Sequence, residues 1–479
     1  MSAARLIPLV IALGTLAFGA VYPWGYVPLF AIAAAIGIAG LTREGVRPPM
    51  RPVVAALVLL CAAAAVQLAP LPSPVRDWLS PATSGLLSRY DLAYAGEAGW
   101  APLSINPRGT RIAVFALCAL SLYLVGLPAL LHGRGVRALP TTLAIFAVPL
   151  AVFGIYTREY NNGLMYWFWE TRDVPYTLGG GTNQFGPFVN RNHFGGWMLM
   201  TVCLLIGSLF ARLERVRSER GTRRQRPLEW LGSAEANGLL LMIAAVVVAV
   251  ISLVWTMSRS AMVGFAGAAA AFAWLAVHRK RLGLKRRTAA VAALATAVLA
   301  AVVWRGPAAL FAWFQNERDL LGRFATWRDG AEVVRDFPVF GTGLNTFSDA
   351  MLFYQTGNRG FHMAQAHNDY VQLAAEGGLL LVVPAAAATF LLARAIRQNL
   401  RAARAESRGY WIRAGAAIGM LGVALQEVFE FSLQIPVNAL LFATLAAVAL
   451  TPVVRHARPA DISHDTIENS GKTDSAPLP

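Results

Sequence analysis

Apolar and polar stretches alternate along most of this chain. Twelve apolar segments stand out, each of about 15 to 20 residues. A helix needs about 20 apolar residues to cross a hydrocarbon core of about 30 Å, so several segments are near the short limit. The pattern predicts an all-α polytopic membrane protein with about 12 transmembrane helices. The segments are 6–20, 27–41, 53–69, 112–131, 139–156, 194–210, 239–257, 261–277, 288–304, 379–393, 412–426 and 437–454.

Basic residues are unevenly distributed over the connections between these segments. One alternating set of connections, together with both ends of the chain, holds 28 of the 42 Lys and Arg residues. The positive-inside rule assigns this set, and therefore both termini, to the cytoplasm. The opposite, outer set holds the remaining 14, which are all arginines. The outer connections are 21–26, 71–111, 157–193, 258–260, 305–378 and 427–436.

Composition supports the membrane interpretation. Hydrophobic residues make up 56% of the chain, charged residues 14%, and the mean hydropathy is +0.50. The net charge of +16 lies mainly in the inner connections, where it orients helices and meets anionic lipid, so no nucleic-acid partner is expected. Cys61, Cys118 and Cys203 all lie in apolar segments, which indicates neither a disulfide framework nor a zinc site.

The chain divides into a transmembrane domain, 1–454, and a polar tail, 455–479, that is predicted to be disordered and cytoplasmic. Two outer connections are longer than connectors need to be: 157–193 has 37 residues and 305–378 has 74. Loops of this length usually fold and carry function.

One stretch of the longer connection has the spacing of a helix. Residues 317–331 predict a helix that lies on the membrane surface or packs under the loop. Its apolar face consists of Leu320, Leu321, Phe324, Trp327 and Ala331.

Three polar clusters stand at the outer, N-terminal ends of helices that run inward. They are 190–193, 258–260 and 366–370. Their good N-cap residues are Asn192, Ser258 or Ser260, and Asn368 or Asp369.

Free backbone amides and the helix dipole make such helix ends anion sites, and a guanidinium beside them suits phosphate oxygens. Arg191 and Arg259 occupy this position, although a single arginine at a helix end also serves as an interfacial anchor.

His367 is the candidate general base, because an imidazole titrates near neutral pH. Asp369 or Glu376 could orient it, and the alternative role is an ordinary hydrogen-bonded loop histidine. The second choices for the base are His193, His362, Asp329, Glu332 and Asp336, of which the carboxylates could instead pair with Arg328 and Arg335.

Several motifs are absent from the sequence. It contains no His-Glu-x-x-His, Gly-x-Ser-x-Gly or Walker motif, and no Asp-x-Asp on the outer side. This argues against metalloprotease, hydrolase, ATPase and metal-dependent nucleotide-sugar transferase functions. No metal site and no cofactor are therefore expected.

Four motifs together resemble the O-antigen ligase and O-antigen polymerase superfamily. They are PFVNRNHFGG at 187–196, MSRSA at 257–261, GTGLNTF at 341–347 and AHNDYVQLAAEGG at 366–378. They occur in the family's order, and the resemblance covers about residues 150–395.

The resemblance implies a multi-pass glycosyltransferase of the bacterial inner membrane, with its large outer loop folded over a cavity that faces the periplasm. Such enzymes take a glycan from undecaprenyl diphosphate, without nucleotide sugar or metal. They transfer it with inversion to a hydroxyl of lipid A-core in ligases, of a second lipid-linked glycan in polymerases, or of a protein.

Carried over to this sequence, the resemblance implies that Arg191 and Arg259 hold the diphosphate and that His367 takes the acceptor proton or orients the hydroxyl. Arg328 would contribute to the same site. The supporting residues would be Asn190, His193, Asp369, Tyr370 and Glu376.

Ligation to lipid A-core is the first expectation. An O-antigen or exopolysaccharide polymerase follows, and protein glycosylation comes third because no extra C-terminal outer domain is evident. A transporter of lipid-linked glycan, in which the same arginines bind the diphosphate without chemistry, is the alternative from another class. The 74-residue loop with His367 distinguishes them, since a carrier does not require it.

Overall fold

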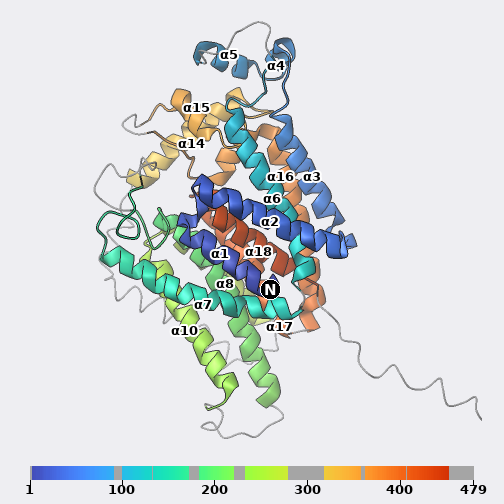
Figure 1. Ribbon diagram of the computed structural model, residues 1–479, viewed down its shortest axis with the longest axis vertical. Coiled ribbons are helices and arrows are strands. Elements are labelled where there is room, and N and C mark those ends of the chain that lie inside the picture. Colours follow the sequence, from blue (N-terminus) through green and yellow to red (C-terminus); the bar gives the residue numbers. More distant parts are fainter. Residues whose placement is uncertain are drawn as a thin grey trace, which may run out of the picture.

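The computed structural model describes residues 3–90, 100–131, 133–171, 183–220, 232–278, 318–357, 362–405 and 407–452. In these ranges the chain forms 15 α-helices and no β-strand, so the all-α prediction is confirmed (Figure 1). The helices are α1 (Ala3–Leu16), α2 (Pro23–Glu44), α3 (Arg51–Val66), α4 (Ser73–Leu79), α5 (Pro81–Tyr90), α6 (Pro107–Leu130), α7 (Gly133–Glu159), α8 (Arg191–Arg220), α10 (Ala234–Trp255), α11 (Arg259–His278), α14 (Arg318–Asp336), α15 (Phe347–Tyr354), α16 (Asp369–Ala402), α17 (Ser407–Gln426) and α18 (Pro436–Leu450).

Eleven of the twelve apolar segments coincide with described helices. The ninth segment, 288–304, and the polar tail, 455–479, lie outside the described residues. By length and composition, eight described helices can cross a membrane, namely α2, α3, α6, α7, α8, α10, α11 and α16, while α1 and α18 are shorter apolar helices. The polytopic character is therefore confirmed for the described part of the chain.

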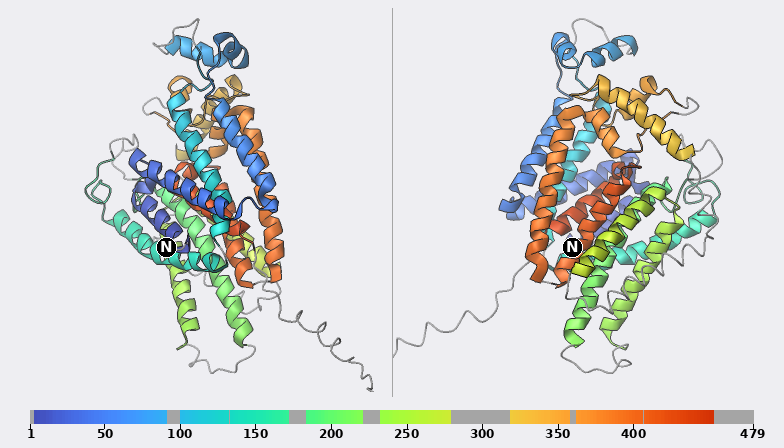
Figure 2. Two further views of the ribbon diagram at one scale, coloured as in Figure 1. Left: turned by 45° about the vertical axis from the view of Figure 1, so that its right-hand side comes forward. Right: turned by 180° about the vertical axis from the view of Figure 1, so that it is seen from behind.

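Helix α8 forms the centre of the bundle. Its apolar span is completely buried, and α7, α10, α11, α17 and α18 pack around it (Figures 1 and 2). The closest approach is to α17, where a Cβ added to Gly207 would lie 2.5 Å from the Trp411 carbonyl oxygen. Small residues let membrane helices approach this closely, because lipid supplies little hydrophobic force between them.

The described parts of the connections 71–111 and 305–378 form a lobe at one end of the molecule, where Figure 1 shows α4, α5, α14 and α15. Its core contains Val333, Phe337 and Phe347 from the 74-residue connection, with Leu86 and Ile105 packed against them from residues 71–111. The connection 71–111, which was not singled out from the sequence, therefore folds with the lobe.

Helix α14 confirms the predicted helix in this connection, and two residues of its predicted apolar face point away from the core of the lobe. Leu321 and Phe324 are 63% and 52% exposed, whereas Thr326, Asp329 and Val333 are buried. Asp329 accepts hydrogen bonds from the Thr356 backbone N–H (2.9 Å) and hydroxyl (2.6 Å), so a polar clamp to the following loop decides which face turns inward. The two apolar side chains remain on the outside of the lobe.

Helix α16 joins the lobe to the bundle. A kink at Gly378 divides it into the short helix and the separate apolar segment, 379–393, that the sequence indicated. Gly378 absorbs the change of direction with φ 53° and ψ −162°, a conformation that suits glycine. A Cβ at this position would lie 2.6 Å from the Val339 backbone. One helix therefore carries residues of both the lobe and the membrane region.

Candidate functional site

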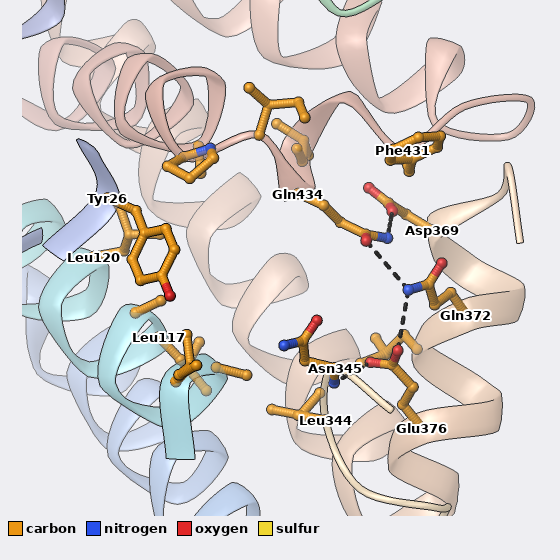
Figure 3. A pocket seen from close by; sticks show the side chains of 18 of the residues that line it. Tyr26, Leu117, Leu120, Leu344, Asn345, Asp369, Gln372, Glu376, Phe431 and Gln434 are labelled. Carbon is orange, nitrogen blue, oxygen red and sulfur yellow. Dashed lines mark hydrogen bonds between the residues drawn. The ribbon is translucent and has the colours of Figure 1, made fainter. Parts of the chain in front are cut away.

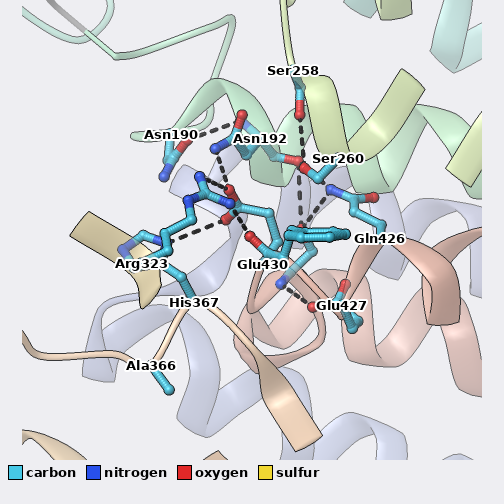
Figure 4. A network of polar contacts seen from close by, with 12 residues as sticks. Asn190, Asn192, Ser258, Ser260, Arg323, Ala366, His367, Gln426, Glu427 and Glu430 are labelled. Atoms are coloured by element: carbon cyan, nitrogen blue, oxygen red, sulfur yellow. Dashed lines mark hydrogen bonds and ion pairs between the residues drawn. The ribbon is translucent and has the colours of Figure 1, made fainter. Parts of the chain in front are cut away.

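The N-terminal ends of α8, α11 and α16 converge on the segment that connects α17 to α18 (Figure 4). The Asn192 amide, near the start of α8, donates to Glu430 at 2.5 Å. The Asp369 N–H, at the start of α16, donates to the Glu427 carbonyl at 3.1 Å. The three polar clusters of the sequence therefore meet, which spacing alone could not establish.

Residues near the start of α8 also meet the start of α11. A Cβ added to Gly195 would lie 2.8 Å from the Ala261 Cβ and 3.4 Å from the Ser258 Cβ. Glycine at this position allows the two helix ends to touch. The amides of both ends, which the sequence analysis treated as separate anion sites, consequently lie on one surface.

Glu430 is the centre of the converged cluster. Its side chain is fully buried, and one carboxylate oxygen accepts from Arg323 at 2.7 Å as well as from Asn192. The other oxygen lies 3.7 Å from Nδ1 of His367. The Arg323 guanidinium also donates to the Phe429 carbonyl. A buried carboxylate thus links an arginine from α14 to the candidate base.

The environment keeps Glu430 ionised. Burial by itself raises the pKa of this carboxyl, but the interaction with His367 and the positive charge of Arg323 outweigh burial and lower the pKa to about 2. A negative charge held next to an imidazole stabilises the imidazolium form.

His367 is held in a conformation that non-glycine residues seldom adopt. Its φ is 50°, in the left-handed region. The Trp327 indole donates to the preceding Ala366 carbonyl at 2.9 Å, and the ring of Phe431 lies edge-on at 5.0 Å from the imidazole. Strained residues of this kind concentrate at functional sites. Nδ1 faces Glu430, so Nε2 is the ring nitrogen that remains for a substrate.

Arg191 and Arg259 are the first residues of α8 and α11, and both are half-buried. Ser258 caps α11 by accepting from the Ala261 N–H at 3.3 Å, as predicted. The predicted cap of α8 was Asn192, but this helix starts two residues earlier than expected. Asn190 accepts from the Asn192 N–H at 2.9 Å and is the cap instead.

Arg328 lies apart from the converged cluster. It is exposed, and its guanidinium donates to the Thr356 hydroxyl at 3.4 Å. Arg323 reaches Glu430 because it is one helical turn before Trp327, whose indole contacts the same loop as His367. The i, i+4 spacing of Arg323 and Trp327 was the sequence signal for Arg323, which was not among the predicted site residues.

The remaining supporting residues hold elements together. Glu376 accepts from the backbone N–H groups of Asn345 (2.7 Å) and Phe347 (3.0 Å), which fixes the 341–347 turn on α16. Tyr370 donates to the Ala424 carbonyl at 2.8 Å and joins α16 to α17. His193 is buried, and its ring lies 4.6 Å from the ring of Phe431, which His367 also contacts.

The other four second-choice bases, His362, Asp329, Glu332 and Asp336, lie elsewhere in the lobe. His362 pairs with the Ser348 hydroxyl at 2.9 Å, and Asp336 accepts from the Tyr354 hydroxyl at 2.8 Å. Asp329 forms the clamp to Thr356, and Glu332 forms an ion pair with Arg335 at 2.5 Å. The structure brings none of these four described residues into the cluster around Glu430.

The comparison with protein families agrees with these observations. Residues 244–386 match the family model described as O-antigen ligase, which confirms the resemblance to that superfamily. The matched segment contains Arg259, Arg323 and His367, while Arg191 and Glu430 lie outside it. No curated protein matches the chain.

The described helices are those of a polytopic membrane protein, and residues 244–386 are similar to the O-antigen ligase family. Proteins of this superfamily are glycosyltransferase-like enzymes, whose partners are, in general terms, lipid-linked glycans and glycan acceptors.

Proposed function

We propose that the protein transfers a glycan from undecaprenyl diphosphate to a hydroxyl of lipid A-core, on the periplasmic side of the bacterial inner membrane. The observation that carries the proposal is the meeting of two arginine-bearing helix ends with a histidine backed by a buried, ionised glutamate. The first half of this arrangement suits a diphosphate, and the second suits a hydroxyl proton.

The donor would bind at the N-terminal ends of α8 and α11. Arg191 and Arg259 supply permanently charged, planar donors, and the helix ends add backbone N–H groups and dipole. As the bond between the anomeric carbon and the diphosphate breaks, negative charge accumulates on the leaving group. Fixed guanidiniums stabilise this charge more in the transition state than in the ground state, which is what accelerates the reaction.

The acceptor would be activated by His367. Its Nε2 takes the hydroxyl proton while the hydroxyl oxygen attacks the anomeric carbon from the face opposite the diphosphate, so that the configuration inverts. Glu430 stabilises the imidazolium that results. Arg323 holds Glu430 in place, and for this reason we assign Arg323 to the site in preference to Arg328.

The assignment of the site to the periplasmic side of the membrane is supported by two observations. Outer connections contact one another through Asn192 and Glu430, and the Trp255 indole, near the end of the segment 239–257, donates to Glu159 of another outer connection at 2.9 Å. The positive-inside rule assigns the opposite connections to the cytoplasm. Both termini would then be cytoplasmic and the site periplasmic.

The proposal is tested by gel electrophoresis of surface glycolipid from a strain that lacks this gene, complemented with the native sequence or with His367→Ala. Ligation predicts that the O-antigen ladder is lost and bare lipid A-core remains, both without the protein and with His367→Ala. If lipid A-core carrying a single repeat remains, the protein is a polymerase and not a ligase. An unchanged ladder would overturn lipid A-core as the acceptor.

A further inference from the structure

A cavity of about 710 Å³ lies on the other side of Phe431 from the converged cluster (Figure 3). It is bounded by α2, α6, α16 and the segment that precedes α18. Its volume falls within the range of about 300–1,000 Å³ that is typical of small-molecule sites. Neither the two arginines nor His367 lines it, so the proposed reaction leaves this cavity unexplained.

One end of the cavity is polar and highly organised. Gln434 donates to Asp369 at 2.6 Å and accepts from Gln372 at 3.2 Å. Gln372 also donates to Glu376 at 3.0 Å, and Glu376 accepts from the Asn345 N–H. These amides and carboxylates form one connected surface along α16 (Figure 3). Such groups offer donors and acceptors for sugar hydroxyls.

The charge of this end excludes an anionic head group. Among the described residues that line the cavity there is no arginine, lysine or histidine, whereas Asp369 and Glu376 both contribute to it. A diphosphate placed here would face two carboxyl groups without a compensating cation. The cavity therefore differs in chemistry from the donor site proposed at α8 and α11.

The opposite wall of the cavity is apolar. Phe30, Ile112, Leu117 and Leu120 line it from α2 and α6, and Tyr26 lies across the cavity from Asn345 (Figure 3). A hydrocarbon chain is the ligand that buries such a wall most favourably. One cavity thus combines a surface for hydroxyl groups with a surface for a chain.

We propose that this cavity binds an uncharged sugar unit of the acceptor against Asn345, Gln372 and Gln434, with a lipid hydrocarbon chain against the apolar wall. Phe431 lines the cavity and its ring also contacts the His367 ring, so the cavity borders the surroundings of the candidate base. The assignment of the ligand as the acceptor rests on the proposed transfer function. The chemistry of the ligand rests on the cavity alone.

The test uses the full-length protein in nanodiscs and two photoreactive probes with the same diazirine-bearing octyl chain. One probe is the β-D-glucoside and the other is the phosphate. The glucoside is expected to label peptides of α2 and α6, and the phosphate is not. Equal or stronger labelling of these peptides by the phosphate would overturn the proposal and assign the cavity to the donor or to phospholipid.

Ala116→Trp fills the apolar wall, and Ile145→Trp, at a position on α7 that is 71% exposed, is the matched control. Ala116→Trp should reduce glucoside labelling about tenfold, which corresponds to about 1.4 kcal/mol of binding free energy, and the control should label like the native protein. Native labelling in Ala116→Trp, with thermal stability preserved in both variants, would contradict the proposal.

A transfer assay separates this inference from the proposed function. With labelled lipid-linked glycan and purified lipid A-core, Ala116→Trp should raise KM for the acceptor and leave KM for the donor unchanged. If the native protein transfers nothing while the glucoside still labels α2 and α6, the function fails and the cavity assignment stands. A raised donor KM with an unchanged acceptor KM would overturn the acceptor assignment.

Discussion

Two polar regions lie on either side of Phe431, and their chemistry is opposite. In the first region, the buried carboxylate of Glu430 contacts Arg323 and His367. Arg191 and Arg259 begin the helices beside it. The cavity along α16 holds Asp369 and Glu376 among amides and an apolar wall, without a cation among its described lining residues. The first suits a diphosphate and a proton transfer, and the second suits hydroxyl groups.

The difference teaches that one short segment can serve two binding modes. Residues 427–436 supply Glu430 to the cluster and Gln434 to the cavity, with Phe431 between them. Substitutions in this segment and in the elements that meet it can therefore break one region and spare the other. The following predictions use that separation.

The largest effect is expected for the two arginines of α14. Arg323→Ala leaves Glu430 as an unpaired buried charge, and breaking a buried ion pair costs about 3–5 kcal/mol of folding free energy. Arg328→Ala removes an exposed side chain and should change stability by less than about 0.5 kcal/mol. Thermal unfolding in detergent measures both. Similar losses of stability in the two variants would show that Arg323 does not stabilise the buried Glu430.

A second pair compares two glutamates that are three residues apart. Burial first, and then the charge of Asp369, raises the pKa of Glu427 well above its usual value and so favours the protonated carboxyl. Glu427→Gln resembles the protonated form and should be tolerated. Glu430→Gln removes an ionised partner of Arg323 and His367 and should abolish most transfer.

Transfer activity and thermal stability are measured for Glu427→Gln and Glu430→Gln. A Glu427→Gln protein as damaged as Glu430→Gln would show that the two carboxyls do not differ in protonation.

Glu430 and Glu427 should affect the stability of the protein in opposite directions as the pH rises. The pKa of Glu430 is lowered to about 2, so its stabilising contribution is complete above the usual value of 4.5 and is lost as the pH falls towards 2. The pKa of Glu427 is raised, so its contribution is complete below 4.5 and is lost as the pH rises through the raised pKa.

Melting temperatures of the native protein and of Glu427→Gln between pH 4 and pH 9 test this sign. The native protein should lose stability on the alkaline side relative to the variant. Parallel curves for the two proteins would contradict the raised pKa of Glu427.

The smallest effect is expected for a residue that serves both regions. Asn368 caps α16 by accepting from the Tyr370 and Val371 N–H groups, both at 3.0 Å. Asn368→Ala should cost about 0.5–2 kcal/mol, the usual value for a lost N-cap. Because α16 carries residues of the cavity and follows His367 directly, donor and acceptor binding should weaken together. A selective effect on one of them would indicate that the cap contacts a ligand.

The sequence predicted what local patterns encode. Apolar segments predicted eleven described helices, and polar residues before them predicted the caps at Ser258 and Asn368. His367, Arg191 and Arg259 were predicted from short motifs. The structure brings the three N-terminal clusters together, although the roles of these residues remain proposals.

Contacts between distant segments could not be predicted in this way. Glu430 meets Asn192 and Arg323 across separations of 238 and 107 residues, and nothing in its own neighbourhood distinguishes it from other loop glutamates. The placement of α14 was left open between the membrane surface and the underside of the loop for a related reason, since its inward face depends on the contact of Asp329 with Thr356. The fold of the lobe, rather than the period of the helix, decided both.

The most direct test of the account is a reconstituted reaction of the purified protein with labelled undecaprenyl diphosphate-linked glycan and lipid A-core. Donor binding and product formation are measured for the native protein, His367→Ala and Arg259→Ala. The account predicts that His367→Ala lowers the rate about 10²–10⁴-fold with donor binding retained, as expected for loss of a general base, and that Arg259→Ala weakens donor binding. Unchanged product formation in His367→Ala, together with lost donor binding in Arg259→Ala, would contradict it.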